Sequence, residues 1–166
     1  MYKYSKQGWL DMENTTETKL ADQLCFSIYN ANRLFAKFYQ KALEPYHLTY
    51  TQYIVLLALW EQDCKTLSDL AKELDLASNT LTPLLKRLET AGWLTRCRGE
   101  NDQRQLMIQL TKKGQEQKVM IEKSLEKCMN EQVEISDNQY YRMLEDNKNL
   151  MAGLKNYLEQ TTSETF

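Results

Sequence analysis

The sequence has few glycines, prolines and histidines and no long apolar run, and each shortage excludes a class of protein. Only 5 Gly and 2 Pro occur in 166 residues, which argues against a collagen-like, linker-rich or disordered chain. The longest apolar run, residues 54–60, is far shorter than the roughly 20 residues that cross a bilayer. Residues 1–10 lack the apolar core of a secretory signal. We therefore expect a single cytoplasmic domain with no membrane partner.

Metal ligands and disulfide patterns are also scarce. There is one histidine, His47, and no CxxC pair, so we expect no metal site and no cofactor. The four cysteines are too few and too widely spaced for a secreted disulfide framework. In a reducing cytoplasm each one is either a small buried apolar residue or a reactive thiol. They are Cys25, Cys64, Cys97 and Cys128.

Charge is unevenly distributed along the chain, although the net value is only -2. Residues 25–43 carry three basic side chains and no acid, and residues 76–98 carry four basic side chains and one acid. Residues 115–166 carry 6 basic and 10 acidic side chains, a local charge of -4. Since only a docking surface must meet phosphates, local basic patches remain compatible with DNA binding.

Helical spacing of apolar residues dominates the first half of the chain. We expect residues 1–16 to be loosely ordered and residues 17–44 to form one long amphipathic helix that ends before Pro45. Thr49 and Gln52 form a capping box for a helix through Trp60, whose apolar density predicts burial on nearly every side. Further start signals are Thr66 with Asp69, then Ser78 as the expected cap of the next helix, which ends at Gly92.

The apolar period changes after Gly92. Residues 93–98 and 106–110 are predicted to be two strands of a hairpin around a polar loop. Two more helices are expected within residues 112–160, the second opened by a capping box at Ser136 and Gln139. The predicted fold is mainly α with a small β-hairpin (α+β), and residues 49–110 have the element order of a winged helix-turn-helix.

The apolar stripe of the helix after Ser78 directs small polar and basic side chains towards solvent. Small polar groups near the start of such a helix can contact base edges in the major groove, and basic groups can contact phosphates. In the hairpin loop, Asp102 can hold Arg104 extended for entry into the minor groove. The alternative is an ordinary solvated face with a surface ion pair. The predicted DNA-binding residues are Ser78, Asn79, Thr80, Thr82, Lys86, Arg87, Arg96, Asp102 and Arg104.

Helices outside the winged region carry apolar stripes that this small core cannot cover. Pairing with a second copy would bury them, so residues 17–44 and 112–160 are predicted to be dimerisation helices. A two-fold homodimer would read two half-sites of double-stranded DNA, a pseudo-palindromic operator.

Four stretches make the chain resemble the multiple antibiotic resistance regulator (MarR) family. They are QLCFSIYNANR from Gln23, LTYTQYIVLLALWE from Leu48, NTLTPLLKRLETAGWLTR from Asn79, and Asp102-x-Arg104. Within that family the chain is most similar to the organic hydroperoxide resistance regulators and related thiol-based sensors. Ala77 departs from the pattern, because members often carry an acidic residue at this position.

The resemblance implies a dimeric repressor that releases its operator when organic hydroperoxides or related oxidants oxidise Cys25. It also implies that Tyr29 and Tyr39 hydrogen-bond to this thiol from the other subunit. Tyr39 lies 14 residues beyond Cys25, about 21 Å along one helix, so it cannot reach the thiol of its own chain. Some members use a second cysteine in a later helix as a resolving thiol, and Cys128 is the candidate here.

Four other interpretations remain open. No Lys, Arg or His lies within four residues of Cys25, so spacing alone favours an inert buried cysteine. A MarR-type regulator could instead be released by a reversibly bound phenolic or aromatic ligand, in a cleft lined by Tyr46, Tyr50 and Trp60. A thiol peroxidase and an interaction module that does not bind DNA are the remaining options. We expect a regulator rather than an enzyme.

Overall fold

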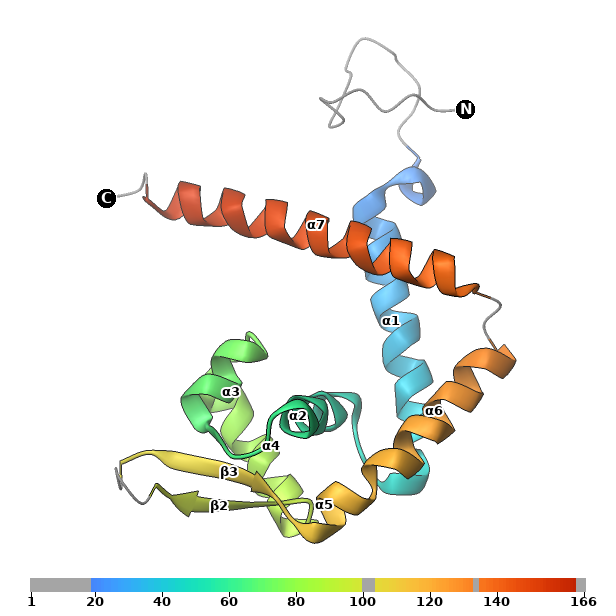
Figure 1. Cartoon of the computed structure of the whole chain (residues 1–166). Coiled ribbons are helices and arrows are strands. Elements are labelled where there is room, and N and C mark those ends of the chain that lie inside the picture. The colour runs from blue at the N-terminus through green and yellow to red at the C-terminus, as the bar shows by residue number, and fades with distance from the viewer. Residues whose placement is uncertain (1–18, 100–103, 133–134, 164–166) are drawn as a thin grey trace.

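The computed structural model describes residues 19–99, 104–132 and 135–163, and shows a mostly helical chain with one small sheet (Figure 1). The predicted tail of residues 1–16 and Asp102 of the hairpin loop lie outside these ranges. In chain order the elements are η1 (Leu20–Asp22), α1 (Leu24–Leu43), η2 (Glu44–Tyr46), α2 (Tyr50–Glu61), β1 (Lys65–Thr66), α3 (Leu67–Glu73), α4 (Ser78–Thr90), β2 (Leu94–Arg98), β3 (Leu106–Leu110), α5 (Lys112–Glu116), α6 (Lys118–Gln132) and α7 (Asp137–Ser163).

Local capping signals place most helix starts where the sequence predicts them. Thr49 and Gln52 make both bonds of the capping box before α2, and the Thr66 side chain caps α3. Ser136 and Gln139 exchange the same pair of bonds before α7. Each of these starts is fixed within four residues of sequence, so the predictions are confirmed.

Three predicted helix boundaries are wrong. The single helix expected from residue 112 is interrupted at Gln117, which separates α5 from α6. Ser78 does not cap α4: Ala77 is the N-cap, and Ser78 is the first helical residue. The long first helix does not run from residue 17, because Gln23 is extended and separates the short turn η1 from α1. Cys25 therefore lies in the first turn of a helix and not in the middle of one.

The sheet has three antiparallel strands in the order β1-β3-β2. The β2–β3 pair is the predicted hairpin, with Arg96 opposite Ile108 and Arg98 opposite Leu106. The third strand, β1, contributes only Lys65 and Thr66, too few residues for a sequence period to reveal. β2 is an outer strand, so among the described residues one of its two edges has no neighbouring strand.

One apolar core joins α2, α3, α4 and the sheet. Most of its members come from α2, the inner face of α4 and the strands, and the equally buried Leu43 of α1, Leu70 of α3 and Ile121 of α6 complete it. The expectation that residues 54–60 are buried on nearly every side holds except at Leu57, which is 39% exposed. The fully buried large side chains are Leu43, Val55, Leu56, Leu59, Leu70, Leu81, Leu85, Leu88, Leu94, Ile108 and Ile121.

The flanking helices form a second part of the molecule. α6 packs against α1, and α7 extends from it across the end of the molecule opposite the sheet (Figure 1). Lys155 of α7 and Asp75 of the α3–α4 turn form an exposed ion pair of 3.3 Å. Large apolar side chains of η1 and these helices stay exposed in the single chain: Leu20, Leu24, Ile28, Tyr29, Leu34, Phe35, Val119, Met120, Tyr140, Tyr141, Met143, Leu144, Met151, Leu154, Tyr157 and Leu158.

Gly114 lets α5 pack directly on the start of β2. A Cβ at this position would lie 2.2 Å from the Trp93 carbonyl oxygen, and the Gly114 carbonyl accepts a 2.8 Å bond from Trp60 Nε1. We expect Gly114→Ala to lower the free energy of unfolding by about 1–3 kcal/mol, because backbone atoms must separate. Urea denaturation at fixed protein concentration measures this change.

Gly153 of α7 supplies a matched control, because nothing lies within 4 Å of its added Cβ. Gly153→Ala should leave stability unchanged or raise it by up to about 1 kcal/mol, since alanine favours the helix. Equal effects of the two substitutions would contradict the close approach at Gly114.

Candidate DNA-binding and thiol-sensing sites

The outer face of α4 is polar and exposed, as its apolar stripe requires. Leu81, Leu85 and Leu88 are buried and Leu84 packs against the same core, whereas Thr82, Lys86 and Arg87 are exposed. The Thr82 hydroxyl donates a 2.7 Å bond to the Ser78 carbonyl, which fixes its rotamer. The exposed predicted DNA-binding residues of α4 are Ser78, Asn79, Thr80, Thr82, Lys86 and Arg87.

The wing arginines do not share one environment. Arg98 and Arg104 are exposed at the far end of the β2–β3 hairpin. Arg96 is bound to Glu89 of α4 through its Nε, at 2.9 Å, and its Nη2, at 2.6 Å. Sequence reasoning grouped Arg96 with the DNA-binding residues, because its partner becomes adjacent only when α4 packs against β2.

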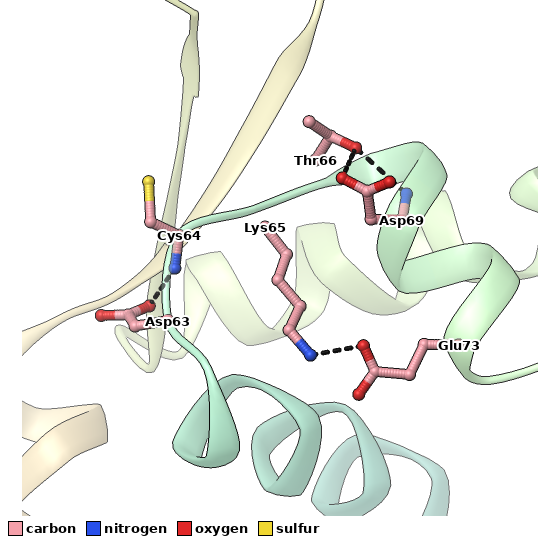
Figure 2. Close-up of polar contacts among 6 residues, drawn as sticks. All are labelled: Asp63, Cys64, Lys65, Thr66, Asp69 and Glu73. Atoms are coloured by element: carbon pink, nitrogen blue, oxygen red, sulfur yellow. Dashed lines mark hydrogen bonds and ion pairs between the residues drawn. The ribbon is translucent and has the colours of Figure 1, made fainter.

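Polar contacts also hold the segment between α2 and α3, as Figure 2 shows. Lys65 of β1 forms an ion pair with Glu73 of α3 and is only 8% exposed. Asp63 Oδ1 accepts the N–H of Cys64 and, at 2.9 Å, that of Leu110 at the end of β3. These bonds tie the helix-turn-helix to the base of the wing, and sequence reasoning missed them.

Cys25 is exposed in the first turn of α1. The first N–H groups of a helix have no helical partner and carry partial positive charge, which favours an anion nearby. The sequence contained no basic neighbour for this thiol, and its place at a helix start depended on a boundary that was predicted wrongly. The exposed position also argues against the inert buried cysteine that spacing alone favoured, within the single chain.

The two tyrosines that resemblance links to Cys25 lie in different settings. Tyr29 is 56% exposed, and the Arg33 guanidinium carbon lies 5.7 Å from its ring centroid. Tyr39 is partly buried and stacks on Tyr50 and Tyr53, with ring centroids 4.5 and 5.7 Å away. Burial raises the pKa of Tyr39 and raises the pKa of Tyr53 to about 12. Tyr39 therefore keeps its hydroxyl proton at neutral pH.

The remaining cysteines are dispersed over the molecule. Cys64 is exposed beside β1, with a left-handed backbone at φ 60, and Cys97 is exposed on β2. Cys128 is half-buried on α6. In the part of the chain that the structure describes, no three His, Cys, Asp or Glu side chains gather as metal ligands do.

An open hollow of about 730 Å³ lies where α1 ends and α2 begins. Its lining includes Lys37, Lys41, His47 and Tyr50. Tyr46 and Trp60, predicted with Tyr50 to line a ligand cleft, point elsewhere: Tyr46 donates to the Met120 carbonyl and Trp60 to that of Gly114. Neither residue lines this hollow, because the hydroxyl of Tyr46 and the indole of Trp60 are bound to backbone carbonyls of α6 and α5.

Among the described residues, no helix combines the length and the apolar character needed to cross a membrane. The family described as Transcriptional regulator SarA/Rot matches residues 37–121, half of the chain, from the last third of α1 to the start of α6. The chain belongs to the SarA/Rot regulators of the MarR family.

Named relatives agree with this MarR-family assignment. The organic hydroperoxide resistance transcriptional regulator of Bacillus subtilis is 44% identical over 104 residues, which cover 62% of this chain and 71% of the relative. SarZ of Staphylococcus epidermidis is 34% identical over 146 residues, covering 88% and 93%. The predicted family, fold class and identity as a transcriptional regulator are confirmed.

The structure also superimposes on that of AbfR, a protein of Staphylococcus epidermidis. Reduced AbfR bound to DNA matches with a TM-score of 0.71 and 46% identity, covering 81% of this chain and 94% of AbfR. AbfR has also been solved overoxidized on DNA and in a disulfide-formed state. Thus a MarR-type protein of the same fold has been captured on DNA in two oxidation states.

Proposed function

We propose that the protein is a DNA-binding transcriptional repressor that senses organic hydroperoxides or related oxidants through Cys25 and releases its operator on oxidation. The observation that carries this proposal is the exposed Cys25 thiol at the start of α1, in a chain whose α4 presents an exposed polar and basic face. Its similarity to the B. subtilis organic hydroperoxide regulator supports an organic hydroperoxide as the signal, and its similarity to AbfR, solved in reduced, overoxidized and disulfide-formed states, supports cysteine oxidation as the sensing chemistry.

Chemistry at Cys25 begins with the thiolate, the nucleophilic form. Its sulfur attacks one peroxide oxygen, the O–O bond breaks, and the alcohol leaves after taking up a proton. Sulfur loses two electrons and becomes a sulfenic acid, while the peroxide gains them. Tyr29 and Tyr39 of the partner subunit are proposed to donate hydrogen bonds from their hydroxyl groups to the sulfur, which favours the thiolate over the thiol.

DNA recognition requires two copies of the chain. We assign residues 17–44 and 112–160 to the dimer interface, residues 49–110 to the winged helix, and the whole of 1–166 to one domain. The exposed apolar faces of α1 and α7, together with the basic character of residues 25–43 and the acidic character of 115–166, favour a second copy as their cover. Oxidation at the start of α1 would then alter the interface that spaces the two α4 helices.

Mass spectrometry of the oxidised protein tests the proposed sensor. After brief exposure of the DNA-binding form to cumene hydroperoxide, we expect oxidation at Cys25 before Cys64, Cys97 or Cys128. A Cys25 peptide joined by a disulfide to a Cys128 peptide, and separated from it by dithiothreitol, would identify Cys128 as the resolving thiol. First modification of any other cysteine, with Cys25 still reduced when DNA is released, would contradict the proposal.

A reversibly bound aromatic acid remains the second candidate signal, and the hollow beside α1 favours it. Lys37, Lys41 and His47 could pair with a carboxylate, and Tyr50 could contact a ring. Calorimetry with benzoate separates the two signals: saturable binding that releases DNA from Cys25→Ser as readily as from wild type would favour the ligand.

A further inference from the structure

Glu89 and Arg96 join the last turn of α4 to the middle of β2. Glu89 Oε1 accepts the Arg96 backbone N–H at 3.0 Å, and Oε2 accepts Nε at 2.9 Å and Nη2 at 2.6 Å. β2 is an outer strand, so this N–H sits on its free edge and receives its acceptor from α4. Arg96 is only 20% exposed, so the ion pair is partly shielded from solvent.

Electrostatics agree with a permanent contact. The hydrogen bonds from Arg96 lower the pKa of Glu89, so its carboxylate stays charged at neutral pH. A guanidinium bound through two of its nitrogens to one carboxylate has a defined direction as well as a charge partner.

The contact joins two elements that are consecutive in the chain, so it can control the angle between them. α4 ends at Thr90, β2 begins at Leu94, and the turn at Ala91 and Gly92 lies between them. Thr111 Oγ1 donates to the Gly92 carbonyl at 2.6 Å, and Lys113 Nζ donates to the Ala91 carbonyl at 2.7 Å. Both bonds are made at the turn itself and not between α4 and β2. The apolar core that α4 shares with the sheet sets the angle between α4 and β2 approximately, and a directional bond between the two elements fixes it more narrowly. Glu89 and Arg96 supply such a bond.

We propose that Glu89 and Arg96 are positioning residues that set the angle between the recognition helix α4 and the wing, and that Arg96 is not itself a DNA ligand. This proposal rests on the proposed DNA-binding function. A winged helix reads DNA by placing its recognition helix in the major groove and its wing against another part of the duplex. The fixed angle allows both contacts at once.

The test uses the full-length protein and a duplex that wild type selects from a randomised pool. Dissociation constants are measured over a salt series for Glu89→Gln, Arg96→Ala and the double variant, with Lys86→Ala as the reference for a lost phosphate contact. We expect both single variants to weaken binding, on the order of tenfold, with an unchanged salt slope. The double variant should be no weaker than either single one, because both remove the same contact.

The opposite outcome is equally distinct. If Arg96 contacts phosphate, Arg96→Ala lowers the salt slope by about 0.9, as Lys86→Ala does, while Glu89→Gln frees the guanidinium and leaves binding unchanged or tighter. That result overturns the proposal. Circular dichroism and thermal unfolding give the folded fraction of each variant, and a loss of affinity that disappears after correction for it also overturns the proposal.

The same measurements distinguish a failure of the positioning role from a failure of the proposed DNA-binding function. Wild type that enriches no duplex and shows no salt-dependent affinity refutes DNA binding and the positioning role together. Wild type that binds, with a reduced slope for Lys86→Ala, establishes the DNA contact whatever Glu89→Gln does.

Discussion

Cys25→Ser is expected to bind operator DNA as wild type does and to stay bound when an organic hydroperoxide is added. Wild type under the same treatment should lose affinity by about 5–150-fold, the usual range for coupling between two sites. Serine keeps the size and polarity of the side chain but cannot attack the peroxide, because its hydroxyl is far less acidic than a thiol. Cys25 is exposed in the first turn of α1, so the substitution leaves no cavity in the core. Fluorescence anisotropy of a labelled duplex, with and without cumene hydroperoxide, measures both quantities.

Cys64→Ser provides the matched control for this experiment. Its thiol is also exposed, but it lies beside β1, in the segment that Asp63 holds against β3. We expect Cys64→Ser to release DNA as wild type does. Release of Cys25→Ser to the same extent as wild type would refute the sensing role and return attention to a reversibly bound ligand or to another cysteine.

Features set within a few residues of sequence were predictable, and features set by packing were not. Thr49 with Gln52 and Ser136 with Gln139 close their capping boxes over three residues, and both predictions are confirmed. Ser78 was misplaced by one residue, because the extended Ala77 satisfies the geometry of an N-cap without a side-chain bond. Helix periodicity carries no information on such a one-residue shift.

In the candidate DNA-binding and thiol-sensing sites, too, local patterns were predictable and tertiary contacts were not. Exposure of Asn79, Lys86 and Arg87 followed from the leucine stripe of α4. The partner of Arg96 did not, because Glu89 lies seven residues away on a different element and meets it only across the α4–β2 turn. Tyr39 likewise acquires its stack with Tyr50 from the packing of two helices. Pattern thus predicts which residues face outward, and tertiary contacts decide which of them remain available to a ligand.

Ile28→Asp is expected to abolish the homodimer and to weaken operator binding by about 10²–10⁴-fold. Ile28 lies on the apolar stripe of α1 with Leu24 and Phe35, and all three are 41–53% exposed in the single chain. A carboxylate at this position would have to be buried unpaired when a second copy covers the stripe, at a cost that the interface cannot offset. A monomer retains one recognition helix and loses the effective concentration that couples two half-sites. Sedimentation velocity gives the oligomeric state, and anisotropy on a palindromic and a half-site duplex gives the affinities.

Leu34→Asp tests whether the apolar stripe of α1, rather than α1 as a whole, makes the dimer contact. Leu34 is 66% exposed on α1 and lies about 100° away from the line of Leu24, Ile28 and Phe35, from 100° of rotation per residue. If the stripe is the dimer contact, Leu34→Asp should stay dimeric and keep its affinity for the palindrome, while Ile28→Asp should bind the palindrome no better than the half-site. Dissociation by both substitutions would mean that a charge anywhere on α1 breaks the dimer, and dissociation by neither would place the interface on α7. If only Ile28→Asp dissociates the dimer, the result also connects oxidation to DNA release. Cys25 lies one helical turn before Ile28 on α1, so a chemical change at its sulfur occurs next to the dimer contact that sets the spacing of the two recognition helices.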